Sequence, residues 1–174
     1  MLRKGLFGLA LSAILVLGAA PSARPDTKDA WLTTKAKIAL LTADGVSATA
    51  VNIDTVDGRV TIHGKVKTAQ EKAKAETVVR QVDGVKEVKN LLQVVPEAEK
   101  EMVKASDENI EDSVEAVLQA DKALEGVKVA SVNKGVVLLS GTTPDLNSKL
   151  KAIELALASP GVKRVAVEIK TEEK

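Results

Sequence analysis

The sequence predicts an α+β fold built from two tandem units, each with the element order αββαβ and two helices packed on a three-stranded mixed sheet. Two stretches, 51–66 and 127–142, alternate apolar and polar residues around a glycine turn, which is typical of a β-hairpin. The distance from turn glycine to closing glycine is the same in both, Gly58 to Gly64 and Gly135 to Gly141. From the hairpin onward the two copies align without a gap, so a chain of 174 residues is best divided into two small domains.

The first unit is predicted to span residues 27–95. Asp26 and Thr27 can cap a helix that runs to about Ala43. Its expected apolar stripe consists of Trp31, Ile38 and Leu41, with Leu32 and Leu40 beside them. The hairpin follows, and a second helix is predicted over 69–82 from apolar residues at helical spacing. The valine-rich stretch 85–95 is the expected third strand. A strand-helix-strand crossover after an antiparallel hairpin makes the sheet mixed and places both helices on one face.

The second unit is predicted to span residues 106–170, after a short, charged, proline-led linker at 96–105 that is either irregular or partly helical. Ser106 and Asp107 are expected to cap its first helix, whose buried stripe begins at Ile110. After the second hairpin, Pro144 is expected to open a helix that ends at Ser159, since proline is tolerated in the first turn. The last strand is predicted over 162–170, and residues 171–174 form a charged tail.

The N-terminus resembles a secretory signal peptide. Arg3 and Lys4 precede an apolar run from Leu6 to Leu17 that ends in small residues, and this run is too short to cross a bilayer. We expect residues 1–23 to be removed, although the cleavage position within the segment stays open. The alternative is an uncleaved N-terminal anchor. Removal takes two of the 25 basic residues and leaves a mature net charge of about −1.

Composition excludes several classes of function. The chain has no cysteine, so disulfides, thiolate metal sites and cysteine nucleophiles are absent. Aromatic residues make up 1% of the chain, too few for base stacking on single-stranded nucleic acid. A formal net charge of +1 provides no basic surface for duplex DNA, so no nucleic-acid partner is expected.

Three segments of the first unit resemble the BON domain family. They are residues 29–37 with an acidic-x-Trp-Leu-Thr pattern, residues 55–66 with a Gly-x-Val-x-Ile-x-Gly hairpin, and residues 82–90 with Gly-Val-x-x-Val-x-Asn. The second copy resembles the family less closely, because it has Ile110 where the first has Trp31 and no Asn follows its last Val-x-x-Val. The resemblance implies αββαβ modules of the bacterial envelope, usually periplasmic, which are implicated in phospholipid contact and stress protection and are not known as enzymes.

The remaining motifs favour structural roles. Six glycines are expected to shape the backbone: Gly58, Gly64, Gly84, Gly135, Gly141 and Gly161. His63 is the only histidine, and on a strand without ligand partners we expect it to face solvent. The carboxylates between Asp107 and Glu115 are interpreted as a solvated acidic face of a helix. No set of residues for nucleophilic, acid–base or metal chemistry is present, so we expect no catalysis, no metal and no cofactor.

Trp31 is the single tryptophan, with Lys28, Lys35 and Lys37 nearby. A tryptophan beside lysines suits a membrane interface, where the ring lies among headgroups and the ammonium groups meet anionic lipid. The alternative places the ring over the small sheet as core, and alignment of Trp31 with Ile110 favours that alternative.

The helix predicted over 144–159 carries two apolar stripes. Ala152, Leu155 and Ala156 form the stripe expected to face the sheet, and a second stripe lies about 120° around the helix. Its members are Leu146, Leu150, Ile153 and Leu157. This second stripe either packs against the first unit, or forms a surface for a partner or lipid, or faces the sheet because the helix is rotated.

The signal-peptide pattern and the family resemblance together imply an exported, periplasmic protein without catalytic activity. Its implied role is envelope maintenance and stress protection through weak contact with phospholipid or with another envelope component. The alternative is a protein-binding or chaperone-like module that uses the stripe from Leu146 to Leu157.

Overall fold

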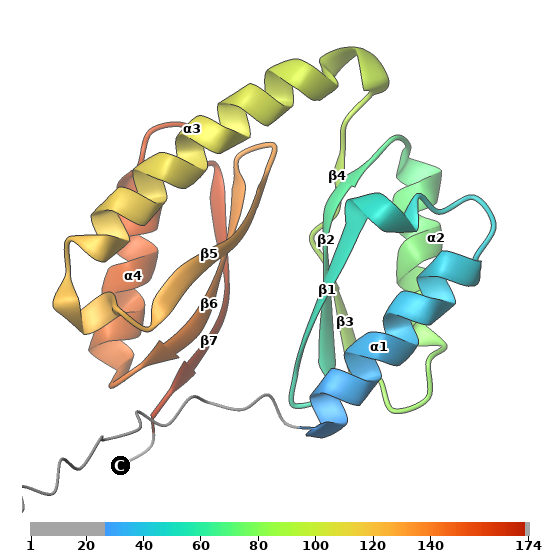
Figure 1. Ribbon diagram of the computed structural model, residues 1–174, viewed down its shortest axis with the longest axis horizontal. Helices are drawn as coiled ribbons and strands as arrows, with labels where there is room; N and C mark the ends of the chain where they lie inside the picture. The colour runs from blue at the N-terminus through green and yellow to red at the C-terminus, as the bar shows by residue number, and fades with distance from the viewer. Residues whose placement is uncertain (1–26, 173–174) are drawn as a thin grey trace, which may run out of the picture.

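The computed structural model describes residues 27–172, and within them the predicted element order occurs twice (Figure 1). The first unit consists of α1 (Thr27–Thr42), β1 (Val51–Val56), β2 (Arg59–Val66), α2 (Ala69–Arg80), β3 (Glu87–Asn90) and β4 (Gln93–Val94). The second consists of α3 (Lys100–Gln119), β5 (Val127–Asn133), β6 (Val136–Thr143), α4 (Leu146–Ala158) and β7 (Arg164–Thr171). The predicted signal peptide, the Asp26 cap and the end of the charged tail lie outside the described residues.

Both sheets are mixed, which confirms the predicted fold class. In each unit the hairpin strands are antiparallel, and the last strand joins the central strand in parallel: β1–β2–β3 and β5–β6–β7. The sequence predicts one continuous third strand in the first unit, but the structure divides it into two. It breaks between β3 and β4, where Leu92 N–H donates to the Asn90 side chain at 3.1 Å instead of joining the ladder. Leu91 and Leu92 are both buried, but in different clusters of side chains.

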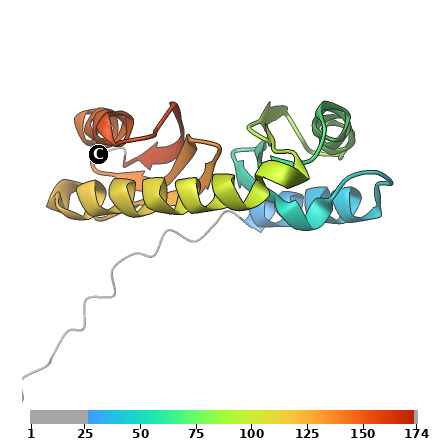
Figure 2. The ribbon, with the colours of Figure 1, turned by 90° about the horizontal axis from the view of Figure 1, so that it is seen from above.

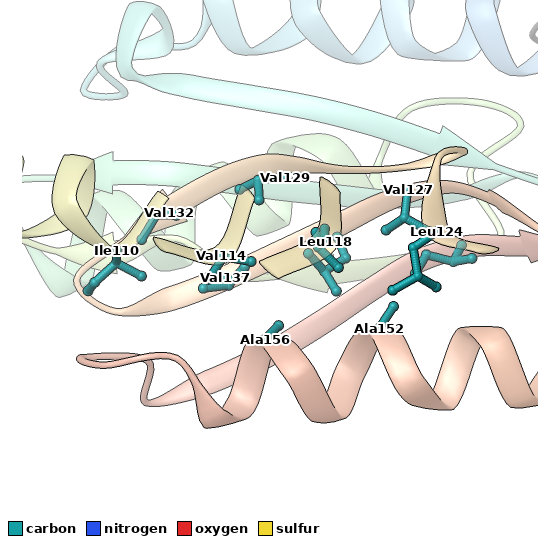
Figure 3. Packing of buried hydrophobic residues seen from close by; sticks show 12 residues of the cluster. Ile110, Val114, Leu118, Leu124, Val127, Val129, Val132, Val137, Ala152 and Ala156 are labelled. Atoms are coloured by element: carbon teal, nitrogen blue, oxygen red, sulfur yellow. The ribbon is translucent and has the colours of Figure 1, made fainter. Parts of the chain in front are cut away.

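Each sheet buries one face against its own pair of helices (Figures 1 and 2). In the first unit the core lies between α1, α2 and the sheet, around Leu40, Ile62 and Val79. In the second unit Ala152 and Ala156 of α4 and the α3 stripe from Ile110 to Leu118 cover β5 and β6 (Figure 3). The two cores are separate, as expected for two domains.

A buried aspartate ties the first helix of each unit to the hairpin turn. Asp29 accepts hydrogen bonds from Asp57 N at 2.7 Å and Gly58 N at 2.9 Å. Asp107 does the same for Lys134 N at 2.9 Å and Gly135 N at 3.0 Å. Both residues of each turn have positive φ, as a type I′ hairpin requires, and the first of them is not glycine. The carboxylate therefore stabilises a turn that costs backbone strain.

These aspartates define the structural alignment of the two first helices. With Asp29 matched to Asp107, Leu32 matches Ile110. The Cδ1 atoms of these two residues occupy equivalent places, 3.5 Å and 3.0 Å from where a Cβ on Gly84 and on Gly161 would stand. Trp31 then matches Asn109. The sequence alignment of Trp31 with Ile110 was wrong by one residue. Of the predicted apolar stripe, Leu32 and Leu40 are buried, whereas Trp31, Ile38 and Leu41 are exposed.

The charged linker is mostly helix. α3 begins at Lys100, six residues before the predicted cap, and its first turns bury Val103. Ser106 and Asp107 therefore do not cap the helix. Asp107 also does not belong to a solvated acidic face, because it is only 4% exposed and its oxygens bind the hairpin turn. At the other end of the unit α4 begins at Leu146, not at Pro144, because the Asp145 side chain accepts from Ser148 N and serves as the cap.

The closing glycines of the two hairpins allow a close approach of the backbone. A Cβ on Gly64 would lie 2.1 Å from Ala50 O, and a Cβ on Gly141 would lie 1.9 Å from Gly126 O. The two glycines have φ values of 128° and 123°. No other residue fits these two positions without moving the backbone just before the first strand of the hairpin.

Each sheet has one face that its own helices leave uncovered, and these two faces pack against each other. The molecule therefore has four layers, with the sheets inside and the helices outside (Figures 1 and 2). A small apolar cluster joins the sheets through Leu91, Leu138 and Ala166. Polar contacts surround it, including a hydrogen bond of 2.6 Å from Thr61 Oγ1 to Glu168 Oε1. We call this contact the inter-unit interface.

Candidate functional site

The outward side of α1 carries three large exposed apolar residues. Trp31, Ile38 and Leu41 are 62%, 54% and 58% exposed, and they lie on the side of the helix opposite to Leu32 and Leu40, which enter the core. The intervals of seven and ten residues bring all three onto one stripe. We call this surface the α1 face.

Basic side chains lie beside Trp31. Lys28 and Lys35 are one helical turn before and after it, and both border a hollow of about 440 Å³ that extends to the β1–β2 turn. Lys86 lines the same hollow and donates to Asp57 O at 2.9 Å. Lys35 Nζ lies 3.7 Å from Asp83 Oδ2. The hollow at one end of the first unit is therefore lined by the indole ring and by three lysines, together with Asp29, Asp57 and Asp83.

Lys37 does not belong to this surface. Its Nζ donates to Ala48 O at 3.0 Å and to Val51 O, so the ammonium group holds the start of β1 against α1. The four residues predicted to act together are thus divided. Trp31, Lys28 and Lys35 lie together, whereas Lys37 points to another side of the helix. Ile38 and Leu41, which belong to the apolar stripe predicted for this helix, lie exposed with Trp31.

The second unit serves as an internal comparison. The positions in α3 that match Trp31, Ile38 and Leu41 are Asn109, Ala116 and Gln119, and all three are exposed. Because both copies have the same fold, the fold does not require large apolar residues at these positions. Of the two first helices, only α1 carries this exposed apolar stripe, which is the pattern expected of a contact surface.

The apolar surface of the second unit lies on α4 instead. Leu146, Leu150 and Leu157 are 61%, 55% and 51% exposed, and Ile153 is half-buried at the margin of the same stripe. We call this surface the α4 face. Ala152 and Ala156 are fully buried against the sheet, so the alternative of a rotated helix is wrong.

The α4 face does not pack against the first unit. In both views α4 lies on the outer side of the second sheet, away from α1 and α2 (Figures 1 and 2). The matching positions of α2 are Ala69, Ala73, Glu76 and Arg80. Each unit therefore exposes an apolar helix face, on a different helix, and these two helices, α1 and α4, lie on opposite sides of the molecule.

The remaining carboxylates of α3 form a negatively charged surface. Glu111 lies among other acids, and burial together with the charges of Glu115, Asp112, Glu108 and Asp107 raises the pKa of its carboxyl. This side of the second unit should repel anionic surfaces, because its negative charges lie close together along one helix.

Glu71 holds together the start of α2. Its carboxylate accepts from Ser47 N and from Lys67 N, the latter at 2.9 Å, next to the Thr68 cap. Burial alone would raise its pKa, but these hydrogen bonds outweigh burial and the pKa is lowered. The second unit has Ser148 at the matching position, so this ionised group is specific to the first unit.

His63 does not face solvent as predicted. It is 4% exposed in the inter-unit interface, and Nε2 lies 3.0 Å from Asp54 Oδ2. Among the described residues Nδ1 has no hydrogen-bond partner. The prediction failed because His63 lies on the sheet face that the helices of the first unit leave uncovered. In a single unit this face would meet solvent, but here the second unit covers it.

The described part of the chain shows neither a metal cluster nor a membrane span. Within residues 27–172, no three side chains of His, Asp or Glu come together in a way that could hold a metal ion. None of the helices in the same range has the length and apolar character needed to cross a bilayer.

Comparison with known families finds the BON domain twice, at residues 28–96 and 106–173. Among curated proteins, the Osmotically-inducible protein Y of Escherichia coli strain K12 is 33% identical over 148 residues, which cover 83% of this chain and 73% of the relative. The two family matches coincide with the two structural units.

Two solved structures of CdsD, a structural protein of the type III secretion system of Chlamydia trachomatis, also align with the chain. The structure of its C-terminal domain has 14% identity and a TM-score of 0.33 and covers 83% of this chain and 67% of its own. The other has 15% identity and a TM-score of 0.31 and covers 81% of this chain and 61% of its own.

Proposed function

The chain belongs to the BON domain family, and from that membership we propose that it is a non-catalytic protein of the bacterial envelope that acts under osmotic stress and contacts phospholipid through the α1 face. The name of its relative from Escherichia coli refers to osmotic induction. The signal-peptide pattern of residues 1–23 supports export to the periplasm.

The observation that carries the lipid proposal is the exposed stripe of Trp31, Ile38 and Leu41 beside Lys28 and Lys35. An exposed tryptophan is stable at the depth of lipid headgroups, because its apolar ring leaves water there while its N–H still finds a hydrogen-bond acceptor. Lysines next to the ring add attraction to anionic lipid, worth about 1 kcal/mol for each residue near the surface.

The contact is proposed to be weak and reversible. Three apolar side chains and two or three lysines bury little surface, and the mature net charge of about −1 opposes strong attraction to anionic lipid. The acidic surface of α3 directs the second unit away from such a membrane. Anionic vesicles are therefore expected to bind the first unit by its α1 face.

Flotation with vesicles tests the proposal. Phosphatidylglycerol vesicles are expected to retain the protein at low salt, and phosphatidylcholine vesicles are expected to retain much less. Trp31→Ala should abolish retention, whereas Asn109→Ala, at the matching position of the second unit, should leave it unchanged. Equal retention of both variants, or retention that survives 0.5 M NaCl in Trp31→Ala, would show that the α1 face is not the lipid contact.

A second candidate function uses the α4 face to bind an envelope protein or an exposed apolar segment of one. Its support is the row of exposed leucines, which neither the sheet nor the first unit covers. Leu150→Asp is expected to keep the fold and to reduce crosslinking to such a partner. Ala73→Asp on α2 is the matched control. A folded Leu150→Asp variant with unchanged crosslinking would eliminate this candidate.

A further inference from the structure

We propose that the inter-unit interface is a clamp that opens with ionic strength, so that the two units separate in high salt and close in low salt. The inference concerns how the two domains are held together and does not depend on what the protein binds. Three observations support the proposal: charged contacts cross the interface, few apolar contacts do so, and open hollows lie beside them.

Ion pairs between described residues join the first unit to the second. Lys65 Nζ lies 2.8 Å from Asp107 Oδ2, and Lys89 Nζ lies 3.6 Å from Glu168 Oε1. Lys170 Nζ lies 3.9 Å from Asp57 Oδ1. The lysine side chains of these pairs are between 27% and 50% exposed, whereas the carboxylate partners are 5% (Asp107), 12% (Glu168) and 67% (Asp57) exposed. Dissolved ions can therefore reach the lysine of each pair, and they screen the pair of Lys170 and Asp57 most.

A further ion pair lies where the chain passes between the units. Lys134 Nζ, at the second hairpin turn, lies 3.4 Å from Glu99 Oε2 and donates to Val94 O at 3.2 Å. This lysine connects the end of β4 and the short turn before α3 to the second sheet. The charged contacts therefore extend along the interface from the connection between the units to the far end of the sheets.

The apolar part of the interface is small. Among the described residues, Leu91, Leu138 and Ala166 form its buried cluster, with Ala130 partly buried beside them. Two hollows of about 600 and 740 Å³ lie between the sheets, and residues of both units line each of them. An interface between stable, permanently joined domains buries far more apolar surface than this cluster provides.

The physical consequence is a dependence on salt. Dissolved ions weaken attraction between charges that water reaches, and the screening length falls from about 10 Å at 0.1 M to about 3 Å at 1 M. The few apolar contacts cannot hold the sheets together once the ion pairs are weakened. Because α3 is continuous from Lys100, the chain before it, at residues 95–99, is the place where the units can turn.

Opening would change the geometry of the exposed surfaces. In the closed arrangement the helices α1 and α4 lie on opposite sides of the molecule (Figure 2). Separation at the hinge frees the two units to turn, and it exposes the polar sheet faces around Thr61 and His63.

Distance measurement between two spin labels tests the clamp in the whole protein. The chain has no cysteine, so Lys74→Cys on α2 and Glu154→Cys on α4 provide two unique labels on exposed outer helices. The distance distribution is expected to be narrow in 0.05 M NaCl. In 1 M NaCl a broad, longer component should rise at least about fivefold, because the ion pairs are then screened.

Sucrose and a charge variant separate the clamp from other causes. Sucrose at matched osmolality carries no ions and should keep the narrow distribution, since it favours buried surface. A triple variant should give the broad component already in 0.05 M NaCl; it combines Lys65→Gln, Lys89→Gln and Lys170→Gln. The control variant Lys122→Gln, outside the interface, should not. An unchanged distribution in 1 M NaCl, opening by sucrose, or a triple variant that behaves like the parent would each overturn the proposal.

Discussion

Replacing Asp107 with alanine should destabilise the second unit more than any other single change to a charged residue on α3. The carboxylate is 4% exposed and accepts from Lys134 N, Gly135 N and Lys65 Nζ. Alanine would leave two backbone N–H groups at the turn without an acceptor, and hydrogen bonds to charged groups contribute about 1.5–3 kcal/mol each. Allowing for partial access of water to the turn, we expect a loss of about 3 kcal/mol.

Urea denaturation followed by far-UV circular dichroism measures this loss. At an m-value of about 1.5 kcal/mol/M, a loss of about 3 kcal/mol lowers the midpoint of the second unit by about 2 M. Asp107→Asn keeps one acceptor oxygen and should cost less, about 1–2 kcal/mol. Asp112→Ala, on an exposed position of the same helix, should remain within about 0.5 kcal/mol of the parent.

Hydrogen exchange gives an independent readout, because Lys134 N–H and Gly135 N–H should lose protection in Asp107→Ala and keep it in Asp112→Ala. A midpoint for Asp107→Ala equal to that of Asp112→Ala would refute the reasoning. It would mean that the turn does not need the carboxylate, and that the alignment of the two helices through Asp29 and Asp107 has no energetic basis.

Two further predictions concern the glycines and the pH. Gly141→Ala places a Cβ 1.9 Å from Gly126 O at a φ of 123°, so it should unfold the second unit at a lower temperature, with Glu125→Ala as the mild control; equal melting of these two variants would be the contradicting result. Because the pKa of Glu71 is lowered in the folded state, its contribution to stability is present above the ordinary value of 4.5 and is lost as the pH falls through the folded pKa. Glu71→Gln should therefore reduce stability at pH 7 and bring parent and variant closer together near pH 3, and a difference that does not change with pH would contradict this assignment.

The fold could be predicted because it depends on local patterns that occur twice. Alternation around the Gly58 and Gly135 turns marks the hairpins, and helical spacing marks α2 and α4. The family was recognisable from the first copy for the same reason, since its motif residues shape turns and helix contacts. The predicted start of α3 was six residues too far along the chain. Aspartate is a common helix cap, but Asp107 instead binds a turn 27 residues further along the chain.

The candidate site was harder to predict, because a shift of one residue in the alignment of α1 with α3 decides whether Trp31 is expected to be buried or exposed. Matching Trp31 to Ile110 placed the indole in the core, whereas the buried aspartates match Ile110 to Leu32. An acid followed by apolar residues three, seven and eleven positions later describes the helix correctly in both copies, and it would have revealed Trp31 as exposed. The burial of His63 could not be predicted from either unit alone, because the opposing sheet covers it.

Quenching of Trp31 fluorescence by brominated phospholipids tests the proposed lipid contact most directly, since Trp31 is the single tryptophan of the chain. We expect vesicles of phosphatidylglycerol brominated near the headgroup to quench the emission and shift it to shorter wavelength. Bromine near the end of the acyl chains should quench it less, because the ring lies at the interface. Emission that is unchanged by vesicles at a protein-to-lipid ratio at which the protein floats would show that the membrane is bound elsewhere, and the account of the α1 face would be wrong.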